Sequence, residues 1–208
     1  MFREAASRFY PIVDADICRE RRLDPRAVAA ACFRAGARLL QIRVKAGSSA
    51  GFLALATGIV LDARASGAIV IVNDRADIAR MSNAGGVHVG QEDLTPADVR
   101  TIAGPALVGL STHDQEQVTQ GLASTADYLA VGPVFGTATK NTGHDARGLA
   151  FVQDAAGGGK PIVAIGGITL ERAPSVIAAG AASVAVITDL LTGGDPETRA
   201  RHYLRVLA

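Results

Sequence analysis

The chain has 208 residues and a formal net charge of +1, with 49% hydrophobic and 20% charged residues. A chain of this composition can bury enough apolar surface to offset the entropy of ordering, which argues against a disordered chain. A charge near zero, without a long run of one sign, argues against a nucleic acid or an anionic membrane as partner. We therefore expect small-molecule partners and leave a homo-oligomer open.

The cysteines and the first residues indicate the compartment. Cys18 and Cys32 are too few and too irregularly spaced for a disulfide framework or a zinc site, and we expect structural thiols. The N-terminal MFREAASRFYPIVD has no apolar run after its arginine, and no segment reaches the length needed to span a bilayer. These features favour a cytoplasmic protein.

Short apolar runs alternate with longer Ala-rich stretches of helical periodicity, and this pattern occurs eight times. The runs lack strict alternation, which is typical of parallel strands covered on both faces. We predict strands at 9–13, 39–43, 68–72, 86–89, 106–110, 128–131, 162–165 and 183–187. We predict helices at 25–35, 49–65, 75–81, 96–102, 115–123, 148–156, 170–179 and 196–207.

Helix boundaries have recognisable residues in this sequence. Asp24, Thr95 and Asp195 each precede a proline, as is typical of a helix start, and Gly36 and Gly180 are typical of helix ends. Eight βα units predict a single-domain (β/α)₈ TIM barrel of the α/β class over residues 1–208. An open doubly wound sheet is the alternative, but IVDADICRERRLD stands where a dinucleotide site needs GxGxxG.

The active site of such a barrel lies at the C-terminal ends of its strands, and polar residues follow seven of the eight predicted strands. Gln41, Arg43 and Lys45 share one face of an extended segment. Two inward-facing cations are costly without an anion between them, and a guanidinium suits phosphate oxygens. The pattern favours a phosphate site, with a surface salt-bridge strand as the alternative.

Asp74 and Asp93 follow adjacent predicted strands, so that their carboxylates could share one ion. Oxygen ligands without histidine or cysteine favour Mg²⁺, which commonly binds through one or two carboxylates and substrate phosphates. Lys140 adds a cation, and Gly166 with Gly167 offers backbone N–H groups to a phosphate. The alternatives are helix caps for the aspartates and a tight turn for the glycines.

Two histidines and a serine are less decisive. His113 follows a predicted strand and could act as a general base, but we favour a structural role because no evident nucleophile is near in sequence. Alternation places His88 in the barrel lining, in a different position from the mouth. Ser111 could belong to the site or cap the helix that follows Asp114.

Several motifs in order resemble the thiamine phosphate synthase family: QIRVK, the ND pair of IVNDRADIA, GGVHVGQEDL, GLSTHD, DYLAVGPVFGTATK and VAIGGI. The match covers nearly the whole chain from Tyr10 onward. The VAIGGI motif occurs in many phosphate-binding barrels, whereas NDR, GQEDL and GPVFGTATK together are specific. The resemblance supports the barrel fold and implies a transferase.

The resemblance implies that hydroxymethylpyrimidine diphosphate is coupled to hydroxyethylthiazole phosphate, with release of diphosphate and formation of thiamine phosphate. It implies a dissociative reaction, in which the bond to diphosphate breaks before the thiazole nitrogen attacks. The implied pyrimidine diphosphate ligands are Gln41, Ile42, Arg43, Val44, Lys45, Asn73, Ser111 and Lys140, and Asp74 and Asp93 would bind Mg²⁺. The implied thiazole phosphate ligands are Thr137, Ala138, Thr139, Gly166, Gly167, Ile187 and Thr188.

Arg43, Lys45, Ser111 and Lys140 are the residues to which the resemblance gives a catalytic role, since they would stabilise the departing diphosphate. The chain departs from the family pattern at Val44, Gly85 and Thr188, where the family usually has Glu, Asp and Ser. Two alternatives remain open. One is a thiazole tautomerase, which would have no diphosphate to hold, and the other is a non-catalytic barrel that binds thiamine intermediates.

Overall fold

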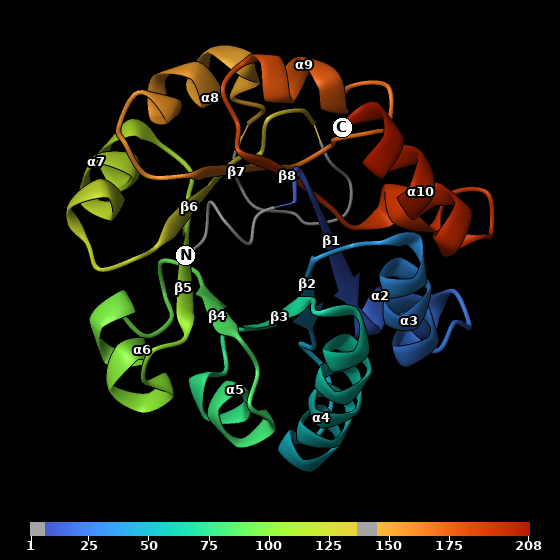
Figure 1. Ribbon diagram of the computed structural model, residues 1–208. Coiled ribbons are helices and arrows are strands. Elements are labelled where there is room, and N and C mark those ends of the chain that lie inside the picture. Colours follow the sequence, from blue (N-terminus) through green and yellow to red (C-terminus); the bar gives the residue numbers. More distant parts are fainter. Residues whose placement is uncertain (1–6, 137–144) are drawn as a thin grey trace.

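The computed structural model describes residues 7–136 and 145–208. Within these ranges, eight parallel strands close into a barrel in chain order, and β8 pairs with β1. Figure 1 shows these strands as an inner ring enclosed by helices. The predicted (β/α)₈ barrel is confirmed. The strands are β1 (Phe9–Asp14), β2 (Leu39–Arg43), β3 (Ile69–Asn73), β4 (Gly86–Val89), β5 (Leu107–Thr112), β6 (Tyr128–Val131), β7 (Ile162–Ile165) and β8 (Ser183–Val186).

Most helices lie where the periodicity predicts them. Asp24, Thr95 and Asp195 each cap a helix by accepting a hydrogen bond from its first turn, as predicted. The helices are α2 (Ala15–Glu20), α3 (Pro25–Ala35), α4 (Ser49–Ser66), α5 (Ala76–Ser82), α6 (Pro96–Ala103), α7 (Gln115–Ala123), α8 (Gly148–Ala156), α9 (Ala173–Ala178) and α10 (Pro196–Val206), with a 3₁₀ helix η1 (Thr188–Leu191).

Three elements differ from the prediction by more than one or two residues at an end. The helix predicted from residue 170 begins at Ala173, because Pro174 occupies the first helical turn and the preceding residues form a turn. Helix α2 directly follows β1 and was not predicted; Asp14 caps it by accepting hydrogen bonds from two backbone N–H groups. The 3₁₀ helix η1 was not predicted and begins two residues after the end of β8, which ends at Val186, one residue earlier than predicted. Short helices like these lack a periodic sequence signal.

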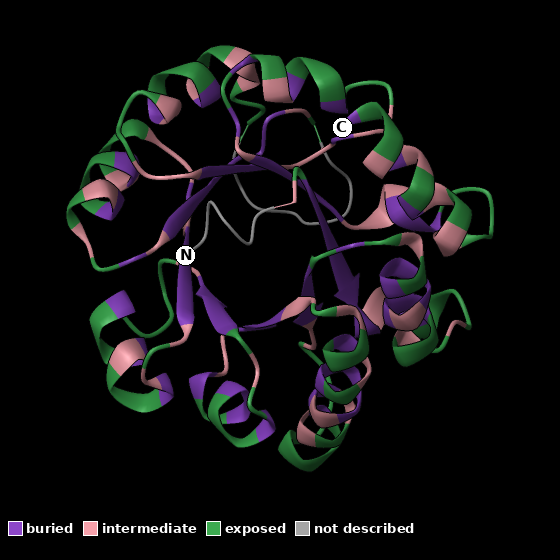
Figure 2. Ribbon diagram, viewed as in Figure 1, coloured by how far each residue is buried: buried purple, intermediate pink, exposed green. Residues whose placement is uncertain are grey.

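Apolar side chains form two layers on the two faces of the barrel. The larger cluster lies between the strands and the helices, and the smaller one fills the interior, with Tyr10, Ile12, Ile71 and Tyr128 among its members. Figure 2 shows the strands as buried and the outward helix faces as exposed. Because side chains alternate along each strand, the residues above the interior cluster point into the mouth.

The register of neighbouring strands decides which polar residues meet there. Asp14 at the end of β1 pairs with Arg43 of β2, and Asn73 of β3 pairs with His88 of β4. Among the described residues, no helix is both long and apolar enough to cross a membrane.

Candidate active site

A cavity of about 440 Å³ opens at the C-terminal ends of β3, β4 and β5. We call it the carboxylate cavity, because Asp74 and Asp93 both line it. Its other lining residues are Lys45, Asn73, His88, Gly90, Gln91, Glu92, Ser111, His113 and Gln117. The structure therefore brings together five of the residues singled out in the sequence, Lys45, Asn73, Asp74, Asp93 and Ser111.

Asp74 is the electrostatic centre of the carboxylate cavity. Its φ of +62° is uncommon for a residue other than glycine, and such conformations cluster at functional sites. Its carboxylate forms an ion pair of 2.5 Å with Lys45 Nζ. Burial raises the pKa of Asp74 above its ordinary value, and the like charge of Asp93 raises it further, while the ion pair acts in the opposite direction. A cation bound between the two carboxylates would relieve this repulsion.

The helix-cap alternative for the two aspartates is wrong. The residue that precedes α5 is Arg75, which makes no capping hydrogen bond with its side chain, and α6 is capped by Thr95. Asp93 instead accepts a hydrogen bond of 2.8 Å from the backbone N–H of Gly90. Both carboxylates thus remain directed at the cavity that they line.

Arg43 forms an ion pair within the protein, as in the salt-bridge alternative, but the pair is largely buried and does not lie on the surface. Its guanidinium donates a hydrogen bond to Asp14, whose side chain is only 2% exposed. Two buried nitrogen atoms at the mouth, Arg43 Nε and Asn73 Nδ2, have no hydrogen-bond partner in the described part of the chain. Unpaired buried donors are costly, and anionic oxygens from a ligand would satisfy them.

Ser111 lies within β5 and is not a helix cap, since Asp114 caps α7. His88 Nε2 lies 2.9 Å from Ser111 Oγ, and both residues line the carboxylate cavity. The expectation that His88 lies apart from the mouth is therefore wrong: its ring extends from β4 up to the level of Ser111. His113 Nδ1 lies 2.8 Å from the carbonyl oxygen of Gly132, which supports the predicted structural role.

A second cavity, of about 380 Å³, opens beside β7 and β8. We call it the glycine cavity. Gly166, Gly167, Ile187 and Thr188, all singled out in the sequence, line it. A Cβ atom on Gly167 would stand 2.5 Å from the carbonyl oxygen of Gly136, and the φ of Gly167 is +61°. Only glycine therefore fits this turn without a shift of its neighbours.

Two arginines that line the glycine cavity were not among the predicted site residues. Arg172 donates a hydrogen bond of 2.8 Å to the carbonyl oxygen of Gly167, and its guanidinium lies 4.7 Å from the ring centroid of Phe135. Arg21 lines the same cavity from the turn after α2. The search for cations directly after the predicted strands did not include them, because Arg172 lies seven residues beyond the end of β7 and Arg21 follows a helix that was not predicted.

Some of the predicted site residues lie elsewhere. The side chain of Ile42 is fully buried in the cluster between strands and helices, and Val44 packs against the same cluster. Any contact of these two residues with a ligand in the barrel mouth would therefore involve their backbone. Gln41 is buried below the mouth. Thr137, Ala138, Thr139 and Lys140 lie outside the described residues.

Paired carboxylates, unsatisfied donors and a glycine turn at the mouth of a barrel define an enzyme that binds small anionic molecules. Comparison with known proteins agrees. The profile of the family described as thiamine monophosphate synthase matches residues 9–190. The chain belongs to this family and is a transferase.

Individual relatives support the assignment. The thiamine-phosphate synthase of Koribacter versatilis (strain Ellin345) is 45% identical over 174 residues, which cover 83% of this chain and 81% of the relative. That of Roseiflexus castenholzii (strain DSM 13941 / HLO8) is 40% identical over 202 residues, covering 96% and 87%. The solved thiamine phosphate pyrophosphorylase from Pyrococcus furiosus has a TM-score of 0.88 and 25% identity, and covers 100% of this chain and 98% of that structure.

Proposed function

We propose that the protein couples hydroxymethylpyrimidine diphosphate to hydroxyethylthiazole phosphate, with the diphosphate in the carboxylate cavity. The observation that carries this proposal is that Asp74, Asp93 and Lys45 line one cavity together with Ser111, with Lys45 paired to Asp74. A tautomerase, which holds no diphosphate, would have no use for this cluster.

The two carboxylates suit Mg²⁺. Among the described residues, no group of three or more His, Cys, Asp or Glu side chains could hold a metal ion without further ligands. Mg²⁺ does not need one, because it commonly binds through one or two carboxylates and substrate phosphates. When bound by Asp74 and Asp93, Mg²⁺ would neutralise charge on the leaving diphosphate.

The protein side chains supply the remaining stabilisation of the leaving group. As the bond to diphosphate breaks, negative charge gathers on the departing oxygen, and preorganised donors nearby lower the barrier. Lys45 supplies a cation and Ser111 a hydroxyl donor at the carboxylate cavity. Arg43 Nε and Asn73 Nδ2, the unpaired buried donors, would bind diphosphate oxygens. Lys140 would add a further cation.

The glycine cavity would bind the thiazole phosphate. The backbone N–H groups at Gly166 and Gly167, with those at Ile187 and Thr188, are the type of donors that barrels present to phosphate after strands seven and eight. Thr137, Ala138 and Thr139 would complete the site. Arg172 brings a positive charge to the same cavity.

The departures from the family pattern are compatible with this function. Gly85 precedes the first residue of β4, at the end of the barrel opposite the mouth. A Cβ atom there would stand 2.7 Å from Ile69 Cγ2, so the tight packing of Gly85 explains a small residue. Thr188 retains a hydroxyl group, and the Val44 side chain packs away from the mouth.

The proposal is tested by measuring diphosphate release with both substrates, with and without Mg²⁺. We expect release that needs Mg²⁺ and both substrates and is lost in Asp93→Ala. The control is Asp154→Ala, which removes one exposed negative charge from α8 outside both cavities and should retain activity. Binding of both substrates without release under any condition would contradict the proposal.

We also propose a cytoplasmic location, which the two thiols support. Cys18 and Cys32 are both free and buried. Burial raises the pKa of Cys18 to about 11 and that of Cys32 to about 12. Thiols with such values stay protonated and unreactive near neutral pH.

A further inference from the structure

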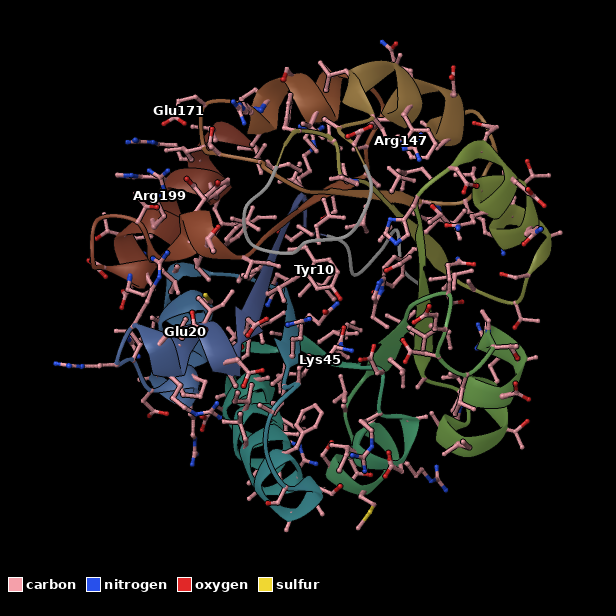
Figure 3. The ribbon with its side chains drawn as sticks, turned by 180° about the vertical axis from the view of Figure 1, so that it is seen from behind. Tyr10, Glu20, Lys45, Arg147, Glu171 and Arg199 are labelled. Atoms are coloured by element: carbon pink, nitrogen blue, oxygen red, sulfur yellow. The ribbon has the colours of Figure 1, made fainter. Side chains whose placement is uncertain are left out.

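A continuous series of polar contacts crosses the barrel interior below the mouth. Gln41 Nε2 donates a hydrogen bond of 3.1 Å to the Tyr10 hydroxyl, which lies 3.0 Å from the Tyr128 hydroxyl. The Tyr128 hydroxyl lies 3.0 Å from His88 Nδ1, and His88 Nε2 lies 2.9 Å from Ser111 Oγ. We call these five side chains the interior relay. Figure 3 shows Tyr10 inside the ring of strands, whereas Arg199 and Glu171 lie on the outer ring.

Gly109 of β5 makes room for the relay. It pairs with His88 on one side and with Tyr128 on the other. A Cβ atom at this position would stand 2.4 Å from His88 Nδ1 and 2.1 Å from Tyr128 Cζ. The missing side chain therefore allows the two rings to approach across β5, with centroids 5.5 Å apart. No larger residue would permit the contact.

Hydrogen bonds in the interior relay are donated in one preferred direction, which Gln41 sets at the buried end. The amide nitrogen of Gln41 can only donate, so the Tyr10 oxygen accepts from it. Tyr10 must then donate its own proton, and within the described residues its other partner is Tyr128. Burial raises the pKa of both phenols, so both stay protonated at neutral pH. The reverse direction would leave the buried Tyr10 proton unsatisfied.

The direction continues to the mouth. A Tyr128 hydroxyl that receives from Tyr10 has its own proton to donate, and His88 Nδ1 lies 3.0 Å from it. With Nδ1 as the acceptor, a neutral His88 carries its proton on Nε2. That N–H donates to Ser111 Oγ. Ser111 Oγ thus accepts a hydrogen bond from His88. The hydroxyl proton of Ser111 is then available to an acceptor in the carboxylate cavity.

We propose that Tyr128 is a positioning residue, which acts through the Nε2–H tautomer of His88 to orient the Ser111 hydroxyl as a donor to the departing diphosphate oxygen. The inference rests on the proposed function for the identity of that acceptor. No proton is transferred along the relay. Its effect is to preorganise one hydrogen bond before charge develops on the leaving group.

The first test measures the tautomer of His88 directly. In the ¹⁵N-labelled wild-type protein without substrate, we expect the ring-nitrogen shifts of a neutral Nε2–H histidine. Tyr128→Phe keeps the ring but loses the donor, and should give a mixture of tautomers. Tyr10→Phe removes the donor that sets this direction but leaves the Tyr128 hydroxyl in place, so it should shift the tautomer of His88 less than Tyr128→Phe does. A wild-type His88 protonated on Nδ1 would overturn the proposal, whether or not the variants fold or the protein releases diphosphate.

The second test asks whether Tyr128 acts through Ser111. We expect kcat to fall about tenfold in Tyr128→Phe and at most about threefold in Tyr10→Phe, with both KM values nearly unchanged. In a Ser111→Ala background, the added Tyr128→Phe change should alter kcat by less than about twofold. An undiminished tenfold loss in that background would show that Tyr128 acts by another route and would overturn the proposal.

Discussion

Asp14 accepts a hydrogen bond from Arg43 across the pairing of β1 and β2, and this contact joins the start of α2 to the floor of the barrel mouth. The same carboxylate caps α2 through the backbone N–H groups of Asp16 and Ile17, at 3.0 and 3.1 Å. One buried side chain thus orients a predicted diphosphate ligand and begins a helix.

Asp14→Asn tests the cost of leaving the Arg43 charge without its carboxylate. Asparagine is as good a helix cap as aspartate, so the change removes mainly the charge. We expect the free energy of unfolding to fall by about 3 kcal/mol, because a buried ion without its partner is costly. Urea denaturation measures it. Asp62→Asn, which breaks an exposed pair with Arg26, should have a much smaller effect.

Asp93→Asn separates metal binding from folding. At Mg²⁺ about a hundred times above Kd, a specific site should raise the Tm of the wild-type protein by roughly 5–10 °C. We expect this rise to vanish in Asp93→Asn and to persist in Asp154→Asn, which removes an exposed charge outside both cavities. Differential scanning calorimetry with and without Mg²⁺ makes the comparison. A rise that survives the loss of Asp93 would place the metal elsewhere.

The same variant has a predicted pH dependence without metal. Because the folded-state pKa of Asp74 is raised, its contribution to stability is full below its ordinary pKa and is lost as the pH rises through the folded-state value. Asp93→Asn removes the like charge and lowers the pKa of Asp74, which reduces that loss. The metal-free variant should therefore be at least as stable as the wild-type protein at pH 7. A lower Tm for the variant at this pH would contradict the prediction.

Gly167→Ala should impair the glycine cavity selectively. Alanine at a positive φ costs about 1–2 kcal/mol, and here its Cβ would also collide with the carbonyl oxygen of Gly136. We expect the KM for the thiazole phosphate to rise at least about tenfold, with little change in that for the pyrimidine diphosphate. Gly193→Ala is the matched control, since its φ is +82° but a Cβ atom there would meet nothing within 4 Å. An equal effect of both variants would point to backbone strain alone.

Arg172→Ala tests the cation that the sequence interpretation missed. A charge-assisted hydrogen bond to phosphate contributes about 1.5–3 kcal/mol, so the KM for the thiazole phosphate should rise at least about tenfold. The KM for the pyrimidine diphosphate should stay the same. Arg205→Ala, which removes an exposed cation at the end of α10, is the control. The two KM values are measured by steady-state kinetics with each substrate varied in turn. A rise in the KM for the pyrimidine diphosphate alone would contradict the prediction.

The local sequence was sufficient for the fold and for one half of the site. Hydrophobic runs and helix-start residues such as Asp24 and Thr95 specify local structure, and eight βα units leave few ways to bury both faces of a parallel sheet. Asp74 and Asp93 follow adjacent strands, so strand order alone predicts that they meet. The motifs that resemble thiamine phosphate synthases added the substrates, which no periodicity encodes.

Tertiary structure decided what depends on register and on contacts between distant segments. The partner of Arg43 is Asp14, and that of Ser111 is His88, because the shear of a closed barrel selects one residue on each neighbouring strand. Alternation predicts which face a residue occupies but not how far a ring such as that of His88 extends. The interior relay needs five strands and a gap at Gly109, so it exists only once the barrel has closed.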